Sequence, residues 1–431
     1  MDKKIWVINH NAQPPSLGGL CRHYYFKKNI DRNQYDVKII TSSVIHNTKI
    51  DMLENSDKVL ETKVVDGEEF VFLKTNTYAG NSLKRKFNFL SFAFKLKKLP
   101  KLLGEKPDLI YTSSPDIFAA FYAVKLAKKI KVPCVVEIRD LWPESIIEYG
   151  DFSPRHPFIK IMYMMEKWIY KNATSIVFTT EGERQYLIDR GWQKSISLDK
   201  CYYINNGVEL DSLEEKKQNF VYKDEILNNS NIFKCVYVGS IRKANNIKLI
   251  AECAQAMKEK KDIHFLFFGD GNEKQEIEDF CKEAEISNCH FYGHVDSKYI
   301  PYICANADIN ILNYKKAKTL KYGGSQNKLF DYLASGKPII STVPMNYNLI
   351  ERANCGITLE NYGAKELADA ILQIYSLTNE EREEMGIRGI EIAKEFDFKI
   401  LAERFLYVIE KSLGIESERE YKVYEGEKIN G

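Results

Sequence analysis

Short apolar runs alternate with amphipathic segments through the first 208 residues of the chain. The apolar runs predict buried strands, and the segments between them place apolar residues at helical spacing. Strands that alternate with helices indicate crossover connections and a parallel sheet covered on both faces. The expected strands are Ile5–Asn9, Val37–Thr41, Phe70–Leu73, Leu109–Thr112, Cys134–Ile138, Ser175–Thr179 and Cys201–Ile204. The expected helices are Leu20–Ile30, Ile117–Lys129, Phe158–Lys171 and Gly182–Arg190.

The alternation stops at a polar stretch, residues 209–231, and then restarts. We interpret this stretch as a linker between two consecutive α/β domains. The expected organisation is a first domain over 1–208, a second over 209–395, and a last amphipathic helix with a charged tail over 396–431. The second domain is expected to have strands at Lys234–Val238, Ile263–Phe268, Ile309–Leu312, Pro338–Ser341 and Gly356–Leu359. Its expected helices are Ile247–Lys258, Glu273–Glu285, Asn327–Ala334, Lys365–Tyr375 and Glu380–Glu395.

Length and composition agree with two globular domains. A single core stops growing near roughly 250–300 residues, and this chain has 431. Its 44% hydrophobic and 28% charged residues exclude a disordered chain or a fibre. Its apolar runs are shorter than the ~18 residues needed to cross a bilayer. The nine cysteines include no C-x-x-C pair, which argues against a disulfide framework or a structural zinc site. We therefore expect a cytoplasmic protein.

Charge is distributed unevenly along the chain. Residues 1–208 carry 32 Lys and Arg against 23 Asp and Glu, and subtraction from the totals of 62 and 60 leaves 30 against 37 for residues 209–431. Part of the positive excess lies in residues 84–101, which hold seven basic residues, no acid and four aromatics. Each basic residue near anionic lipid contributes about 1 kcal/mol to the free energy of membrane binding, so we expect this segment to contact an anionic membrane surface. A solvated helix with inward-facing aromatics is the structural alternative. The acidic second half of the chain argues against binding of nucleic acid.

The loop after the first expected strand contains adjacent glycines, Gly18 and Gly19. Glycines before a helix let backbone N–H groups approach an anion, which the helix dipole also favours. His23 follows this loop and is a candidate acid or base, although a loop histidine is often structural. A plain turn between strand and helix is the alternative interpretation of the glycines.

The run Val135–Glu144 takes an apolar strand directly into charged residues and Trp142. Ligands bind at the carboxyl ends of strands in open parallel sheets, and charges there are costly unless paired or functional. Arg139 is suited to a phosphate, and Asp140 can accept hydrogen bonds from a sugar hydroxyl. An ion pair that only fixes the loop is the structural alternative.

Two glycine turns follow strands in the second half. Arg242 and Lys243 come just after Gly239, and a guanidinium with an ammonium group suits a pyrophosphate. Gly269 and Gly271 repeat the pattern after the next strand and leave room for a ligand beside the backbone. Tight turns alone also explain these glycines.

The most informative segment is Gly323–Ile340, in which a glycine-rich loop leads into a short helix, a stop at Gly336 and a buried strand. Such a loop presents free N–H groups to an anion, with Lys328 on the first turn of the helix. Asp331 near the helix start suits a diol such as a ribose. The histidines offer no comparable signal, because no metal-binding pattern surrounds them and no metal site is expected.

Taken together, these features resemble the retaining GT-B glycosyltransferases of the group 1 (family 4) class. The resemblance rests on the Gly18-Gly19 loop, the NNGV segment 205–208, the Gly239 turn and above all KLFDYLASGKPII, and it spans about residues 5–395. EIRDLWPES and the Gly-Gly-x-x-Arg-His start are similar to bacterial enzymes that build O-antigen, capsule and exopolysaccharide. The implied fold is α/β GT-B, with two Rossmann-like doubly wound domains facing a central cleft.

The resemblance implies an acceptor site in the first domain and a nucleotide-sugar site, with a UDP-linked donor, in the second. The last helix would return toward the first domain. The candidate catalytic residues are Arg139, Asp140, Arg242 and Lys243, and the candidate acceptor-binding residues are His23, Arg139 and Trp142. The candidate donor-binding residues are Gly18, Gly19, Gly239, Arg242, Lys243, Gly269, Gly271, Ser325, Gln326, Asn327, Lys328 and Asp331.

The sequence departs from the family pattern at two places. The paired glutamates of the family, with seven residues between them, are here Gly323 and Asp331. The histidine that many members carry after the acceptor-domain strand is Arg139. One carboxylate contact to the donor is therefore missing, and an arginine stands where the family has an imidazole.

The implied reaction is transfer of a hexosyl or N-acetylhexosaminyl group, with retention, to a polyprenyl-linked or oligosaccharide acceptor at the inner face of the plasma membrane. Cations and helix N-termini would stabilise the departing diphosphate, so no metal or other cofactor is expected. Replacing Arg242 or Lys243 with Ala should lower turnover roughly 10²–10³-fold. Two alternatives remain: a nucleotide-sugar 2-epimerase of the same layout, and an inactive membrane-associated scaffold, which the missing glutamate at Gly323 would explain.

Overall fold

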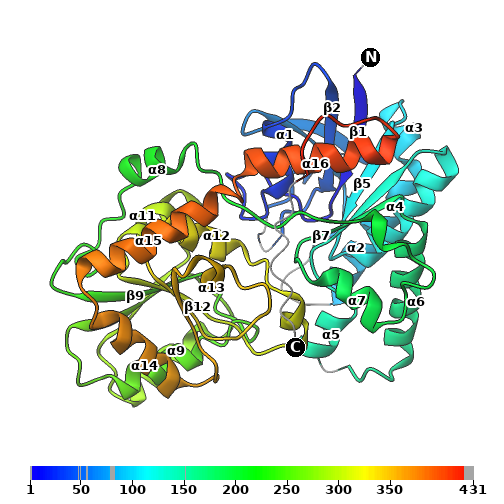
Figure 1. The fold of residues 1–431 in the computed structure, drawn as a ribbon. Coiled ribbons are helices and arrows are strands. Elements are labelled where there is room, and N and C mark those ends of the chain that lie inside the picture. The colour runs from blue at the N-terminus through cyan, green and yellow to red at the C-terminus, as the bar shows by residue number, and fades with distance from the viewer. Residues whose placement is uncertain are drawn as a thin grey trace. The chain divides into compact units, whose positions relative to one another are not determined.

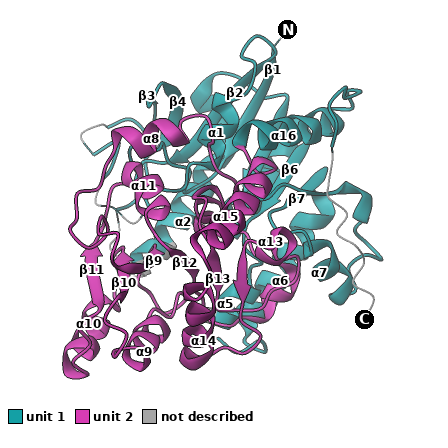
Figure 2. Cartoon of the chain, turned by 60° about the vertical axis from the view of Figure 1, so that its left-hand side comes forward, with its two compact units in different colours: residues 1–205, 398–431 teal, residues 206–397 magenta. Residues whose placement is uncertain are grey.

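A computed structural model describes residues 2–421, except 47, 49, 55–56, 78–82 and 151. The chain forms two compact units (Figure 2): unit 1 comprises residues 1–205 and 398–431, and unit 2 comprises residues 206–397. The chain thus passes into unit 2 between Asn205 and Asn206, three residues before the boundary expected from the sequence. The polar stretch interpreted as a linker lies inside unit 2, where its middle forms helix α8 (Leu213–Asn219).

Unit 1 contains an eight-stranded sheet in the order β3-β4-β2-β1-β5-β6-β7-β8. All neighbouring strands are parallel except β3, which pairs antiparallel with β4. The sequence pattern does not predict β3, because its residues alternate between exposed and half-buried and form no apolar run. The strands are β1 (Lys3–Ile8), β2 (Tyr35–Ser42), β3 (Leu60–Val65), β4 (Glu68–Leu73), β5 (Leu109–Ser113), β6 (Cys134–Ile138), β7 (Ser175–Phe178) and β8 (Cys201–Tyr203).

Helices cover both faces of this sheet. The β1–α1–β2 and β5–α4–β6 units run in opposite directions along the sheet, so right-handed crossovers put α1 and α4 on opposite faces. The last helix, α16, packs on α1 (Figure 1), while α2 packs on α4 and α4 on α6. The helices are α1 (Arg22–Lys28), α2 (Leu83–Lys95), α3 (Leu99–Leu103), α4 (Ile117–Ile130), α5 (Glu144–Tyr149), α6 (Pro157–Asn172), α7 (Glu183–Asp189) and α16 (Phe398–Leu413), with 3₁₀ turns η1 (Leu96–Lys98) and η2 (Leu198–Lys200).

The basic segment 84–101 forms α2, η1 and most of α3. Phe89 and Phe92 point into the core, whereas Phe87 and Phe94 remain exposed. The segment is therefore a helix with two inward-facing aromatics, as the structural alternative expected, and it also presents two aromatics outward. No helix among the residues that the structure describes has the length and apolar character needed to cross a bilayer.

Unit 2 contains a six-stranded, fully parallel sheet in the order β11-β10-β9-β12-β13-β14. Its strands are β9 (Phe233–Val238), β10 (Ile263–Phe268), β11 (Cys289–Gly293), β12 (Ile309–Leu312), β13 (Ile339–Ser341) and β14 (Gly356–Thr358). Its helices, besides α8, are α9 (Lys248–Ala256), α10 (Lys274–Glu283), α11 (Ile300–Ala305), α12 (Asn327–Ala334), α13 (Leu349–Ala353), α14 (Ala364–Tyr375) and α15 (Asn379–Lys394), with 3₁₀ turns η3 (Ser297–Tyr299) and η4 (Lys318–Tyr322).

Each sheet has one place where the strand order reverses. In unit 1 it lies between β1 and β5, and in unit 2 between β9 and β12. Ligands of doubly wound sheets bind beyond the carboxyl ends of the strands at such a point. The loops that start there contain Gly18 and Gly19 in unit 1, and Gly239 and the 323–326 loop in unit 2.

Candidate functional site

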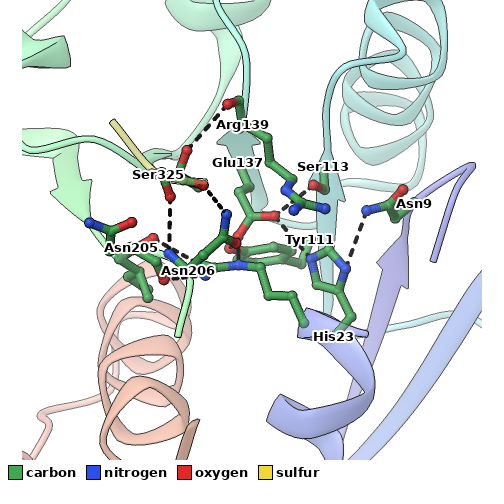
Figure 3. Close-up of polar contacts among 12 residues, drawn as sticks. Asn9, His23, Tyr111, Ser113, Glu137, Arg139, Asn205, Asn206 and Ser325 are labelled. Carbon is green, nitrogen blue, oxygen red and sulfur yellow. Dashed lines mark hydrogen bonds and ion pairs between the residues drawn. The ribbon is translucent and has the colours of Figure 1, made fainter. Parts of the chain in front are cut away.

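The carboxylate of Glu137, near the end of β6, is fully buried and bonded to four side chains (Figure 3). Its Oε1 accepts hydrogen bonds from Arg22 Nε and the Tyr111 hydroxyl, each at 2.8 Å. Its Oε2 accepts one from Ser113 Oγ at 2.6 Å and lies 3.0 Å from His23 Nε2. One acid thus joins β5, β6 and the start of α1, just where the strand order reverses.

These partners decide the charge of Glu137. Burial alone would raise the pKa of its carboxyl group, but the charge of Arg22 and the contact with His23 outweigh burial and hold that pKa well below the usual value. A buried carboxylate is tolerated only when it is paired and its oxygens are satisfied. Glu137 is therefore an ionised, structural centre of unit 1.

His23 is a member of this network. Burial lowers its pKa, against the opposing effect of Glu137. Its Nδ1 lies 3.2 Å from Asn9 Nδ2, at the end of β1, so a neutral ring with its hydrogen on Nε2 satisfies both contacts. Its side chain is 1% exposed. A direct contact with an acceptor, which the sequence predicted, would require this network to open.

The other unit 1 candidates lie at the strand ends. After β6, Arg139 is half-buried and its backbone N–H donates to Ser114 Oγ at 2.8 Å, Asp140 is exposed, and Trp142 is half-buried. These three residues are close in sequence and follow one strand, as expected. The hydroxyl of Ser114 fixes the backbone from which Arg139 projects.

Gly18 and Gly19 differ in their surroundings. A Cβ on Gly18 would lie 2.2 Å from Oε1 of Gln13, which folds over the loop and accepts a hydrogen bond from the N–H of Leu20. A Cβ on Gly19 would meet nothing within 4 Å. A side chain at position 18 would therefore displace the end of the Gln13 side chain, whereas one at position 19 would meet no neighbour.

In unit 2, Lys328 on α12 reaches the turn that follows β9. Its Nζ donates to the Tyr237 hydroxyl at 2.8 Å and lies 4.2 Å from the centre of that ring. A Cβ on Gly239 would lie 2.9 Å from this Nζ. Burial lowers the pKa of Lys328 to about 7. The amine is thus a desolvated cation beside a glycine turn, an environment that a bound anion would complement.

The three predicted glycines of unit 2 form one packed layer. Gly239 has φ of +140° and Gly269 has φ of +150°, both in the region that favours glycine. A Cβ on Gly269 would lie 1.8 Å from the carbonyl oxygen of Gly239, and one on Gly271 would lie 2.0 Å from that of Ile241. Close packing of the β9 and β10 turns therefore explains these glycines without a ligand.

Arg242 and Lys243 are both exposed, on a turn whose backbone is fixed. Asn313, just after β12, donates from Nδ2 to the carbonyl oxygens of Asn245 and Asn246 at 2.5 and 2.8 Å. The two cations therefore project from a rigid turn at the same strand end as Lys328. They make no ion pair with other residues in the described part of the chain.

The glycine-rich loop and α12 contain the remaining candidates. Gly323 has φ of +105°, Ser325 and Gln326 are half-buried, and Asn327 begins the helix. Asp331 is half-buried one turn further on, and burial raises the pKa of its carboxyl group to about 7. Lys328 is the member of this group that the structure brings to the Gly239 turn.

Three residues that make the contacts described here were not among the candidates predicted from the sequence: Arg22, Glu137 and Asn206. Glu137 was visible as a charge in an apolar strand, but Arg22 lies 115 positions away in the chain. Asn206 lay in the NNGV segment, to which no role was given. Its N–H and side chain bond Ser325 in the glycine-rich loop.

Two family descriptions match the chain. The "Glycosyl transferase 4-like domain" matches residues 30–196, and "Glycosyl transferases group 1" matches residues 232–376. TuaH of Bacillus subtilis (strain 168), named as a teichuronic acid biosynthesis glycosyltransferase, is 28% identical over 209 residues. That match covers 48% of this chain and 50% of TuaH, so the chain spans half the length of this relative.

Solved structures with the same fold match almost the whole chain. HepE of Anabaena in complex with UDP aligns with a TM-score of 0.67 and 14% identity, over 95% of this chain and 100% of HepE. WaaG, a glycosyltransferase involved in lipopolysaccharide biosynthesis, gives 0.65 and 14%, over 94% and 99%. Trehalose-6-phosphate synthase OtsA gives 0.72 and 12%, over 95% and 99%. The sequence therefore predicted the fold correctly: two Rossmann-like α/β domains of the GT-B type.

Proposed function

Because this chain belongs to the group 1 glycosyltransferases and has the GT-B fold, we propose that it transfers a hexosyl or N-acetylhexosaminyl group from a UDP-linked donor. The observation that carries the donor assignment is Lys328, held at the Gly239 turn where the strand order of unit 2 reverses. UDP in the HepE complex supports the choice of nucleotide.

The chemistry of the proposed reaction is departure of a nucleoside diphosphate with retention at the sugar carbon. Negative charge grows on the diphosphate as the bond to the sugar breaks, and preorganised cations stabilise that charge. Lys328 would meet the diphosphate from α12, and Arg242 and Lys243 from the β9 turn. Asp331 would accept hydrogen bonds from the ribose. Protein cations thus supply the charge that a metal ion supplies in other transferases.

We assign the acceptor to unit 1. Arg139, Asp140 and Trp142 follow β6 and offer a cation, an exposed carboxylate and an aromatic surface to a glycan. The Glu137 network fixes the end of that strand and the start of α1. The teichuronic acid relative supports an acceptor in bacterial cell-surface polysaccharide synthesis, lipid-linked or oligosaccharide.

A lipid-linked acceptor would require the enzyme to work at the inner face of the plasma membrane. On α2, Phe87 and Phe94 are 62% and 50% exposed, and Lys97 lies 5.1 Å from the centre of the Phe94 ring. On α6, in the same helix layer, Ile161 and Met164 are 55% and 71% exposed. We propose that residues 84–101, together with this face of α6, contact anionic lipid, since exposed apolar side chains amid cations suit that surface.

The direct test is turnover of UDP-sugars by the purified chain, with and without a lipid-linked acceptor and with EDTA present. We expect UDP release that depends on the acceptor and is insensitive to EDTA. Conversion of the sugar without an acceptor would indicate the epimerase instead. Absence of UDP binding and turnover across the panel would overturn the donor assignment and favour the scaffold.

A further inference from the structure

Asn206, the first residue of unit 2, bonds the glycine-rich loop at two points. Its backbone N–H donates to Ser325 Oγ at 3.1 Å, and its side-chain Nδ2 donates to the Ser325 carbonyl oxygen at 2.5 Å. Asn206 itself is 5% exposed. Both bonds lie within unit 2, and they join segments 119 residues apart in the chain.

These bonds matter because the loop that they join is rich in glycine. Gly323 and Gly324 precede Ser325, and glycines lose more conformational freedom on ordering than other residues. Ser325 is the last residue before Gln326, which caps α12, and Lys328 lies on the first turn of that helix. The position of Ser325 therefore governs where the loop N–H groups and the Lys328 amine are presented.

The backbone before Asn206 is itself held in unit 1. Arg22 donates to the carbonyl oxygen of Ile204 at 2.7 Å and to that of Asn205, and Glu137 holds Arg22 through its Nε. Asn205 bonds the Tyr203 hydroxyl with its own side chain. Asn206 thus extends from a backbone that is fixed up to the preceding residue.

We propose that Asn206 is a positioning residue of the donor site: it holds Ser325 so that the glycine-rich loop and α12 are preorganised for the diphosphate. This inference rests on the proposed donor site in unit 2. It assigns no contact between Asn206 and the donor, because Asn206 acts through Ser325. Loss of a preorganising contact weakens binding, since the ligand must then order the loop.

The test compares Asn206→Ala with Asn205→Ala, the neighbouring asparagine, whose side-chain Nδ2 bonds the Tyr203 hydroxyl. UDP affinity of each full-length variant is measured by calorimetry, and hydrogen exchange is followed over residues 323–328. Asn206→Ala loses the bond from the side-chain Nδ2 to the Ser325 carbonyl oxygen and keeps the backbone N–H bond to Ser325 Oγ. The loss of one hydrogen bond predicts UDP binding weaker by roughly 3- to 10-fold. We expect Asn205→Ala to stay within about twofold of the wild type.

Three further readouts separate positioning from a general structural defect. KM for the UDP-sugar should rise in Asn206→Ala while kcat at saturating donor changes little, and saturating UDP should restore exchange protection of the loop. If Asn206→Ala does not fold, the near-isosteric Asn206→Asp replaces it, because its carboxylate opposes the Ser325 carbonyl and should weaken UDP binding similarly. Unchanged UDP affinity in the folded variant overturns the inference. A wild-type chain that binds no UDP overturns the proposed donor site instead.

Discussion

The Lys328 amine lies 2.8 Å from the Tyr237 hydroxyl and 4.2 Å from the centre of the same ring. Tyr237 belongs to β9 and Lys328 to α12, so this contact brings the helix start to the strand end where the order of the sheet reverses. Lys328 makes no ion pair with the other residues described in the structure. The aromatic ring holds this half-buried cation in a position from which it can bind an anionic ligand.

The first prediction concerns Lys328 and donor affinity. Replacing it with Met removes the charge and keeps most of the apolar stem. A hydrogen bond to a charged group contributes about 1.5–3 kcal/mol, so we expect UDP binding weaker by roughly 10- to 150-fold in calorimetry. Lys365→Met, an exposed lysine paired with Asp369 on α14, is the matched control and should bind UDP normally. Equal affinities in the two variants would refute the role of Lys328.

The second prediction is the pH dependence of donor binding. The pKa of Lys328 in the free protein is lowered to about 7 by burial. A bound diphosphate favours the protonated amine and raises this pKa, so binding above pH 7 takes up a proton. Affinity should therefore be highest below pH 7 and fall by up to about tenfold per pH unit above it.

Calorimetry from about pH 6 to about pH 9 tests this dependence, with proton uptake obtained from buffers of different ionisation enthalpy. A UDP-sugar is the suitable probe, because its diphosphate is esterified at both ends and keeps its charge over this range. Lys328→Arg should flatten the profile, since a guanidinium stays protonated throughout. A wild-type profile as flat as that of the arginine variant would contradict the assignment.

The third prediction concerns the stability of unit 1. Glu137→Gln leaves the buried Arg22 guanidinium without its counter-charge, and breaking a buried pair costs about 3–5 kcal/mol. The exposed Glu391→Gln should change the free energy of unfolding by less than about 0.5 kcal/mol. Denaturant titration measures both, and similar midpoints for the two variants would show that the network is not required for stability.

The effect of Glu137→Gln should also depend on pH. The folded-state pKa of Glu137 lies well below the usual 4.5, so its ionised form stabilises the fold above that value. This contribution is lost as the pH falls through the folded-state pKa. The difference in free energy of unfolding between the wild type and Glu137→Gln should therefore be largest at neutral pH and become smaller in acid.

The fourth prediction contrasts two glycines. Gly239→Ala forces a residue with φ of +140° to carry a Cβ 2.9 Å from Lys328 Nζ, so we expect lower thermal stability and weaker UDP binding. Gly19→Ala places its Cβ in open space and should leave the melting temperature unchanged. If a ligand approaches the loop backbone, turnover of Gly19→Ala should nevertheless fall several-fold. Normal turnover would show that Gly19 has no such contact.

The sequence predicted best what depends on local pattern. Buried parallel strands such as Cys134–Ile138 and Ile263–Phe268 match β6 and β10 residue for residue, because each is a mostly apolar run. Half-exposed strands such as β3 lack that signal. The Glu137 network could not be predicted from the sequence, because it depends on which residue of α1 contacts β6 after folding. The same holds for Asn206, whose importance lies in a contact with Ser325 rather than in its residue type.

The last prediction concerns the membrane. The wild-type chain should co-sediment with phosphatidylglycerol vesicles at low salt, and much less at high salt or with phosphatidylcholine vesicles. Phe87→Ser/Phe94→Ser removes the exposed rings of α2 and should reduce binding roughly 30-fold, since partial burial of each of the two rings in lipid contributes about 1 kcal/mol. Ile387→Ser in α15 alters a residue that is 57% exposed in unit 2 and serves as the control.

The same assay distinguishes the two helices of the proposed lipid-contacting surface. Ile161→Ser/Met164→Ser on α6 should add to the effect of the α2 double variant if both helices enter the lipid, because contributions from separate side chains add. An effect of the α2 variant alone would restrict the surface to residues 84–101. If the wild-type chain stays in the supernatant with phosphatidylglycerol at low salt, the membrane proposal fails, whatever the outcome of the donor experiments.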